Sequence, residues 1–125
     1  MKKIIVTKNA PEPIGPYSQA TQAGGFVFVS GQVAKDYATG KIVTDGIQNE
    51  TKMVMQNVKN ILETAGSSLD KVVKTTIFLT NMDDFAKMNE VYGSFFTGNY
   101  PARETVQVSK LPLNVNVEIS VIALA

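Results

Sequence analysis

The sequence predicts an α+β fold in which two helices cover one face of a mixed β-sheet. Apolar residues recur every three or four positions in two segments, Asp45 to Gly66 and Asn81 to about Thr97, which is typical of amphipathic helices. Short apolar or alternating segments flank both helices, so the expected order is β-β-β-α-β-α-β-β, with crossover helices followed by a closing hairpin. At 125 residues the chain is about one domain, which we expect to span residues 1–125.

The first strands are expected in the N-terminal third. Ile4 to Thr7 form a short strand, and Gly24-Gly25 predicts the hairpin turn before the apolar strand Phe26 to Val29. That strand ends at Ser30-Gly31-Gln32, where small residues let a ligand approach the backbone, although most such steps are merely turns. Gly15 and Pro16 fix the backbone that presents Tyr17, and by itself this segment is more often a connecting turn with a packing tyrosine.

The first helix is expected to begin at Asp45, which with Gln48 resembles a capping box, and to end before Gly66. Its spacing predicts a core stripe of Ile47, Thr51, Val54, Met55, Val58, Ile61, Leu62 and Ala65. A β-rich strand, Val72 to Leu79, follows it.

The second helix is expected to begin at Asn81-Met82-Asp83-Asp84. Its apolar face carries Phe85, Met88, Tyr92, Phe95 and Phe96. Asn89 lies on the same face, and a polar amide there needs a partner, which could be internal, in another subunit or in a ligand pocket.

The C-terminal part predicts a β-hairpin that contains Arg103, the only arginine of the chain. Ala102 to Val108 and Val115 to Val121 both alternate, and pairing Val108 with Val115 would align their apolar faces. Thr105 would then lie opposite Glu118, and Arg103 would lie diagonally from Glu118 on one polar face. A solvent-exposed pair of this kind contributes about 0.2–1 kcal/mol, and on pattern alone it is the commoner case. Arg can also grip a carboxylate with two parallel bonds, which makes Arg103 the first site candidate.

Composition excludes several classes of function. The chain has no Cys and no His, so it has no disulfides, no Ser-His-Asp or Cys-His catalysis and no zinc site of the usual ligand types. The net charge is +1 without a basic block, which makes nucleic acid an unlikely partner.

We expect a soluble, cytoplasmic protein, because no segment approaches transmembrane length and the N-terminal apolar run is too short for a signal peptide. Two strands apolar on both faces suggest that a second copy of the chain covers the sheet.

Over essentially its whole length, the chain resembles the RidA branch of the Rid (YjgF-like) reactive intermediate deaminases. The motifs that carry the resemblance are Asn9-Ala10-Pro11, Ile14-Gly15-Pro16-Tyr17, Ser30-Gly31-Gln32, Asn57-Val58-Lys59-Asn60-Ile61-Leu62 with Ala65-Gly66, Val73-Lys74-Thr75-Thr76, Phe95-Phe96, Pro101-Ala102-Arg103 and Val117-Glu118-Ile119. The resemblance implies a chorismate-mutase-like homotrimer with sites between subunits. It also implies an activity that needs no cofactor: the hydrolysis of 2-aminoacrylate, 2-aminocrotonate and their imines to 2-oxo acids and ammonia. Pyridoxal-phosphate dehydratases would release these reactive substrates.

The resemblance also implies roles for particular residues. Arg103 would bind the substrate carboxylate, Glu118 would position or activate water, Tyr17 would wall the pocket, and Ser30 and Gly31 would line it.

Three further positions follow from the same resemblance. Asn89 would be another pocket or interface group. Thr105 stands where many bacterial members carry cysteine, and it would serve through its backbone carbonyl. Glu104 stands where a small or apolar residue is usual, and by alternation it should point away from Arg103.

Two other functions remain open from the sequence. A trimeric module that binds 2-oxo acids or other small carboxylates would use Arg103 equally well, but an anion receptor gains nothing from Glu118. Some family members are named as ribonucleases or translation inhibitors. The absence of a basic face and of histidine disfavours such an activity for this chain.

Overall fold

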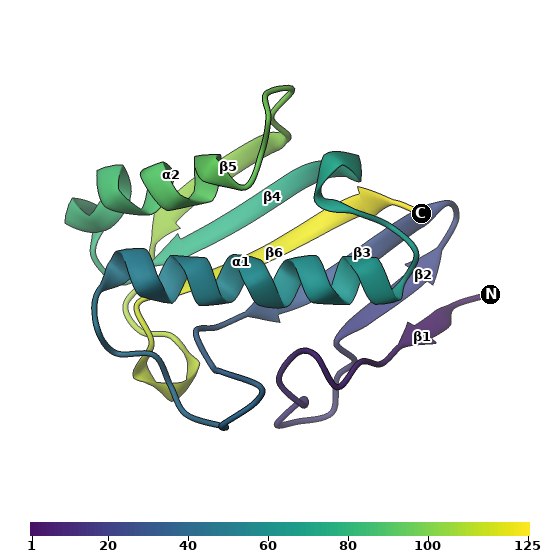
Figure 1. Cartoon of the computed structure of the whole chain (residues 1–125), viewed down its shortest axis with the longest axis horizontal. Coiled ribbons are helices and arrows are strands. Elements are labelled where there is room, and N and C mark those ends of the chain that lie inside the picture. The colour runs from purple at the N-terminus through teal and green to yellow at the C-terminus, as the bar shows by residue number, and fades with distance from the viewer.

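The computed structural model describes all residues 1–125. The chain forms a six-stranded mixed sheet with both helices on one face (Figure 1). The elements in chain order are β1 (Lys3–Ile5), β2 (Ala20–Ala23), β3 (Phe26–Gln32), α1 (Ile47–Thr64), β4 (Val72–Leu79), α2 (Phe85–Ser94), β5 (Ala102–Gln107) and β6 (Val117–Leu124). The predicted fold class and the predicted order of elements are confirmed. Neither helix has the length and apolar character that crossing a membrane requires.

The sheet has the strand order β1-β2-β3-β6-β4-β5, in which only the pair β4 and β5 is parallel. The predicted hairpin of β5 with β6 is therefore wrong, because β4 lies between them. Residues 108–116 cross the end of β4 instead, where Val108 N–H donates to Leu79 and Thr80 N–H donates to Asn116. Alternation sets which face each side chain takes, but it does not select the neighbouring strand, and this connection is long enough to pass over one.

The observed register places Arg103 and Glu118 on opposite faces of the sheet. Arg103 is aligned with Thr75, which is fully buried beneath the helices. Glu118 precedes Ile119, which is also fully buried on the helix side, so Glu118 points to the open face. The predicted diagonal contact of Arg103 with Glu118 does not exist within one chain.

α1 supplies most of the core. Seven of the eight predicted stripe residues are buried and the eighth, Ala65, is partly buried, while Gly66 takes the predicted left-handed conformation after the helix. The predicted capping box is wrong. The helix begins one residue after Gly46, and the Asp45 carboxylate accepts from the side chain of Asn49 instead.

α2 is shorter than predicted, because residues 82–84 form a 3-10 turn and the helix ends at Ser94. Asn81 caps that turn by accepting a hydrogen bond from the Asp83 N–H. Of the predicted apolar face, Met88, Tyr92 and Phe96 are buried, whereas Phe85 is exposed.

The sheet face opposite the helices is uncovered in one chain and carries large apolar side chains. In β3, Val27 and Val29 face the helices, whereas Phe26 and Phe28 are 37% and 42% exposed. Leu124 on β6 is exposed too. The strand β3 is thus apolar on both faces, as predicted.

Glu50, in the first turn of α1, fixes the connection that leads into β6. This carboxylate is only 2% exposed and accepts hydrogen bonds from the backbone N–H and the side-chain amide of Asn116, at 3.1 and 2.7 Å. Thr80, just after β4, donates its hydroxyl to Asn116 Oδ1. Asn116 therefore joins α1, β4 and β6 two residues before Glu118.

We expect Glu50→Ala to lower the free energy of unfolding by about 1–3 kcal/mol, because both Asn116 donors would lose their acceptor. Denaturant titration followed by circular dichroism measures the change. The matched control is Glu63→Ala, which removes an exposed carboxylate from the same helix. Equal midpoints for the two variants would contradict the role of Glu50.

Candidate functional site

The predicted site residues gather at two separate places. One is a hollow of about 350 Å³ beside α2 and β5, here called the Arg103 hollow. The other is a hollow of about 330 Å³ on the open sheet face, here called the Glu118 hollow. The lining of the Arg103 hollow is Asn89, Tyr92, Gly93, Tyr100, Pro101 and Arg103. The lining of the Glu118 hollow is Ile14, Tyr17, Ser30, Gly31, Pro112 and Glu118.

Arg103 has no carboxylate partner in the chain. The one ion pair of the structure joins Lys74 to Glu104 at 3.1 Å. The single hydrogen bond of the guanidinium runs from Nη1 to Asn89 Oδ1 at 2.7 Å, which identifies the internal partner that Asn89 needs. Because a guanidinium carries several further N–H donors, most of them are free for an anionic ligand.

Two aromatic rings of α2 also contact the guanidinium. Its central carbon lies 5.6 Å from the centre of the Phe85 ring and 5.1 Å from that of Tyr92. The Tyr92 hydroxyl donates to Thr75 Oγ1 at 3.0 Å. Burial raises the pKa of Tyr92, against smaller lowering effects of the Thr75 hydrogen bond and the Arg103 charge.

The Glu118 carboxyl lies directly against the backbone of Gly31. The ladder of β3 with β6 is irregular between Val29 and Gln32, at the small-residue step that the sequence singled out. A Cβ added to Gly31 would lie 2.7 Å from the Glu118 carboxyl carbon and from Oε2. Only glycine leaves this space to the carboxyl group.

Burial raises the pKa of Glu118 above its ordinary value. This carboxyl is half-buried and receives no hydrogen bond from the chain. A carboxylate of this kind is a stronger proton acceptor than an exposed one and has free lone pairs for water.

The loop that carries Tyr17 is tied to the same strand end. Ser30 Oγ donates to the Ser18 carbonyl at 2.6 Å, and its N–H donates to Gln19 at 2.9 Å. The Tyr17 hydroxyl accepts from the Ile14 N–H at 3.4 Å. The Ser30 hydroxyl proton is therefore used to hold the loop.

Thr105 lies with Arg103 and not with Glu118. It is aligned with Ile77 of β4, so its predicted position opposite Glu118 is wrong. Its Oγ1 is buried on the helix side and has no hydrogen-bond partner.

Glu104 points away from Arg103, as predicted from alternation. Its carboxylate pairs with Lys74 and accepts from Thr76 Oγ1 at 3.0 Å. The hydrogen bond from Lys74 is the largest of the effects that lower the pKa of Glu104.

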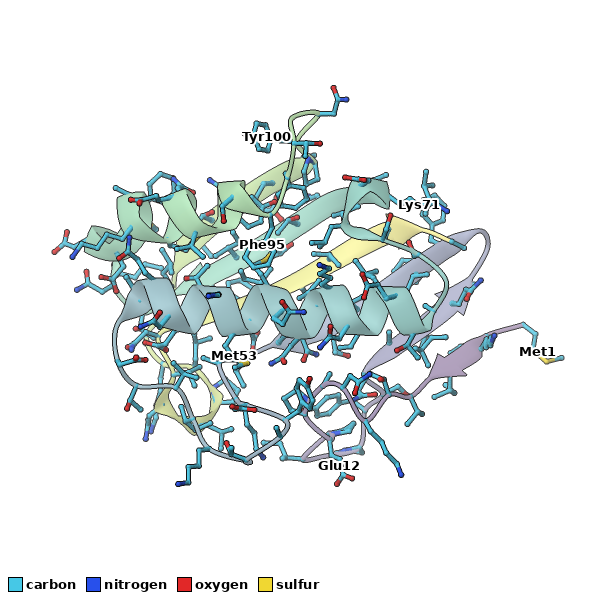
Figure 2. The ribbon with its side chains drawn as sticks, in the orientation of Figure 1. Met1, Glu12, Met53, Lys71, Phe95 and Tyr100 are labelled. Carbon is cyan, nitrogen blue, oxygen red and sulfur yellow. The ribbon has the colours of Figure 1, made fainter.

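The sequence did not identify Phe85, Tyr92 or Tyr100 as site residues. Phe85 and Tyr92 belong to the predicted apolar face of the second helix, where aromatic residues usually pack into the core. Figure 2 shows Tyr100 on the loop that projects between α2 and β5. The available signal was the spacing of Phe85, Asn89 and Tyr92, which places a polar residue between two rings on one helical stripe. No three acidic side chains come close enough together to hold a metal ion.

Comparisons with known proteins cover nearly the whole chain. The sequence model of the family described as Endoribonuclease L-PSP matches residues 7–125. A RutC family protein of Pyrococcus horikoshii is 54% identical over 98% of this chain and 98% of its own length. A Mus musculus protein named 2-iminobutanoate/2-iminopropanoate deaminase is 44% identical over 98% of this chain and 91% of its own length. The crystal structure of E. coli TdcF with bound serine superposes with a TM-score of 0.94 at 44% identity, covering 98% of each chain.

We expect Gly31→Ala to move the Glu118 carboxyl out of its space and to lower its pKa toward the ordinary glutamate value, because the displaced group is better solvated. Carbon-13 NMR titration of the carboxyl measures this. The control is Gly93→Ala, whose added Cβ meets nothing within 4 Å and lies at the other hollow. An unchanged Glu118 pKa in Gly31→Ala would show that Gly31 does not set the environment of the carboxyl.

Proposed function

Because this chain belongs to the Rid (YjgF-like) family, whose sequence model carries the description endoribonuclease L-PSP, we propose that it is an imine deaminase. It hydrolyses 2-iminobutanoate, 2-iminopropanoate and their enamine forms, 2-aminocrotonate and 2-aminoacrylate, to 2-oxo acids and ammonia. The observation that carries the proposal is an arginine with no acidic partner that opens on a hollow. The name of the mouse relative, and the serine bound to TdcF, agree with a small carboxylate ligand.

Each active site is shared by two copies of the chain in a homotrimer. Arg103 of one copy and Glu118 of the next act together, because within one copy they lie on opposite sheet faces. Contact between two different surfaces of identical chains closes into a ring when the rotation permits. The exposed rings of Phe26 and Phe28 on the open face support burial by a second copy.

Arg103 binds the substrate carboxylate. Its free N–H groups form charge-assisted hydrogen bonds to both carboxylate oxygens, which fixes a substrate of a few heavy atoms. Asn89 holds the guanidinium from the other side. Thr105, two residues along β5, completes this wall of the site.

Glu118 positions a water molecule and accepts its proton as the water oxygen attacks the imine carbon. The attack gives a tetrahedral intermediate that carries a hydroxyl and an amino group, and the carboxyl returns its proton to that nitrogen. The carbon–nitrogen bond then breaks as the hydroxyl gives its proton back to the carboxylate, and the products are a 2-oxo acid and ammonia. The carbon of a protonated imine is already electrophilic, so orientation and a proton acceptor are sufficient for the attack. Tyr17, Ser30 and Gly31 wall this side of the site, and pyridoxal-phosphate dehydratases acting on serine or threonine supply the imines.

A second candidate function is a small-carboxylate sensor. The Arg103 hollow is formed entirely within one chain, and by itself it could bind a 2-oxo acid. Glu118 separates the two functions, because a sensor for anions does not need a carboxylate beside the ligand.

We expect Arg103→Ala to lower kcat/KM by about tenfold to a hundredfold, since charge-assisted bonds to the substrate are lost. Glu118→Ala should lower kcat by about a hundredfold or more, since proton transfer is lost. A coupled assay, in which a threonine dehydratase supplies the imine, measures the release of 2-oxo acid. Binding of 2-oxo acids that depends on Arg103, without any acceleration of hydrolysis, would favour the sensor.

Co-expression of the two inactive variants tests the shared site. Each mixed trimer contains one site of three with both native residues, so we expect isolated mixed trimers to recover about a third of the wild-type activity. Differently tagged chains allow mixed oligomers to be isolated, and each variant alone is the control. No recovery in mixed oligomers would place Arg103 and Glu118 in independent sites.

The pH dependence follows from the raised pKa of Glu118. Only the ionised carboxyl accepts a proton, so activity falls as pH drops through this pKa. We therefore expect the acid limb of kcat/KM to have its midpoint above about 4.3, the ordinary glutamate value. Residual activity of Glu118→Ala should lack this limb, and a wild-type midpoint at or below the ordinary value would contradict the assignment.

A further inference from the structure

We propose that Phe85 and Tyr92 form an aromatic clamp that holds the Arg103 guanidinium ready for the substrate carboxylate. The inference rests on the function proposed above and assigns positioning roles to two residues of α2. It concerns how the arginine is held, and its test separates that question from the hydrolysis of imines.

The guanidinium lies close to both rings. Phe85 and Tyr92 are seven residues apart on one helix, so their Cα atoms are separated by a rise of about 10.5 Å along its axis. The central carbon of Arg103 lies 5.6 and 5.1 Å from the centres of the Phe85 and Tyr92 rings. Both distances lie within the range in which a cation is attracted to an aromatic face.

Asn89 lies between the two rings on the same stripe of α2. Its Oδ1 accepts the only hydrogen bond that the guanidinium donates within the chain. Two rings and one amide oxygen therefore fix the arginine from the helix side. The rings attract the positive charge without using N–H donors, which stay available to a carboxylate.

The two ends of the clamp differ in rigidity. Tyr92 is 4% exposed, is anchored to Thr75 through its hydroxyl and packs on Phe96 with ring centres 5.0 Å apart. Phe85 is 38% exposed and makes no comparable packing contact with another ring. Phe85 can thus be changed with little effect on the core, which makes it the position at which to test the clamp.

The clamp also holds Arg103 in place without a carboxylate of the same chain. A carboxylate of the same chain would hold Arg103 as firmly, but it would occupy the donors that the substrate needs. Aromatic faces avoid this competition. Pre-ordering of the side chain strengthens binding because less conformational freedom is lost when the ligand arrives.

We expect Phe85→Leu to raise the dissociation constant of 2-oxobutanoate, measured by isothermal titration calorimetry, by about two- to fivefold, the size of one partly exposed cation–π contact. The KM of imine hydrolysis should rise similarly while the thermal midpoint stays near that of the wild type. Phe85→Trp should bind at least as tightly as the wild type. A fluorinated phenylalanine at position 85 has nearly the same size but a less negative ring face. The protein that carries it should bind 2-oxobutanoate as weakly as Phe85→Leu does.

The control is Tyr37→Leu, which removes an exposed ring from a loop that touches neither hollow. In an Arg103→Ala background, Phe85→Leu should have no further effect on binding. Phe85-dependent binding without any imine hydrolysis would support the clamp while the proposed deaminase activity fails. Equal affinity of the wild type, Phe85→Leu and the fluorinated protein would overturn the clamp even if hydrolysis is normal, and so would a wild type that does not bind 2-oxobutanoate.

Discussion

The position of β4 between β5 and β6 is the constraint on which the candidate site depends. Parallel pairing of β4 with β5 turns Arg103 toward the helices, whereas antiparallel pairing of β4 with β6 leaves Glu118 on the open face. The two charged side chains are therefore kept apart by a full sheet layer. Neither can neutralise the other within one chain, so each keeps its charge available to a ligand.

The Arg103 hollow and the Glu118 hollow are supported by different parts of the fold but share β4. On the helix side, Thr75 of β4 accepts the hydrogen bond that anchors Tyr92 beside Arg103. At the end of β4, Thr80 binds Asn116, which the buried Glu50 also holds before β6 begins. One central strand thus sets the position of both charged groups, and a shift of its register would displace both.

The sequence predicted most features that depend on neighbouring residues, although the capping box at Asp45 was wrong. The stripe around Val54 on α1 and the bounds of Val72 to Leu79 follow from periodicity and β propensity, and both are confirmed. Strand pairing was not predictable in the same way, because residues 108–116 permit either a hairpin or a crossing of β4. The position of Phe85 beside Arg103 was not predictable either, because it is a long-range contact that helical spacing cannot reveal.

Separation of Arg103 from Glu118 is what the proposed chemistry requires. Had they shared one face, as the predicted hairpin implied, the guanidinium would have bound the carboxylate and lost its donors to it. That contact would also favour the ionised carboxylate and lower its pKa, which weakens a proton acceptor. The observed structure instead holds the arginine with rings and an amide, and half-buries the glutamate without a cation. In the proposed assembly the two groups face each other across a substrate. Arg103 then binds the substrate carboxylate and Glu118 binds the water molecule, so both charged groups gain partners only when the site is occupied.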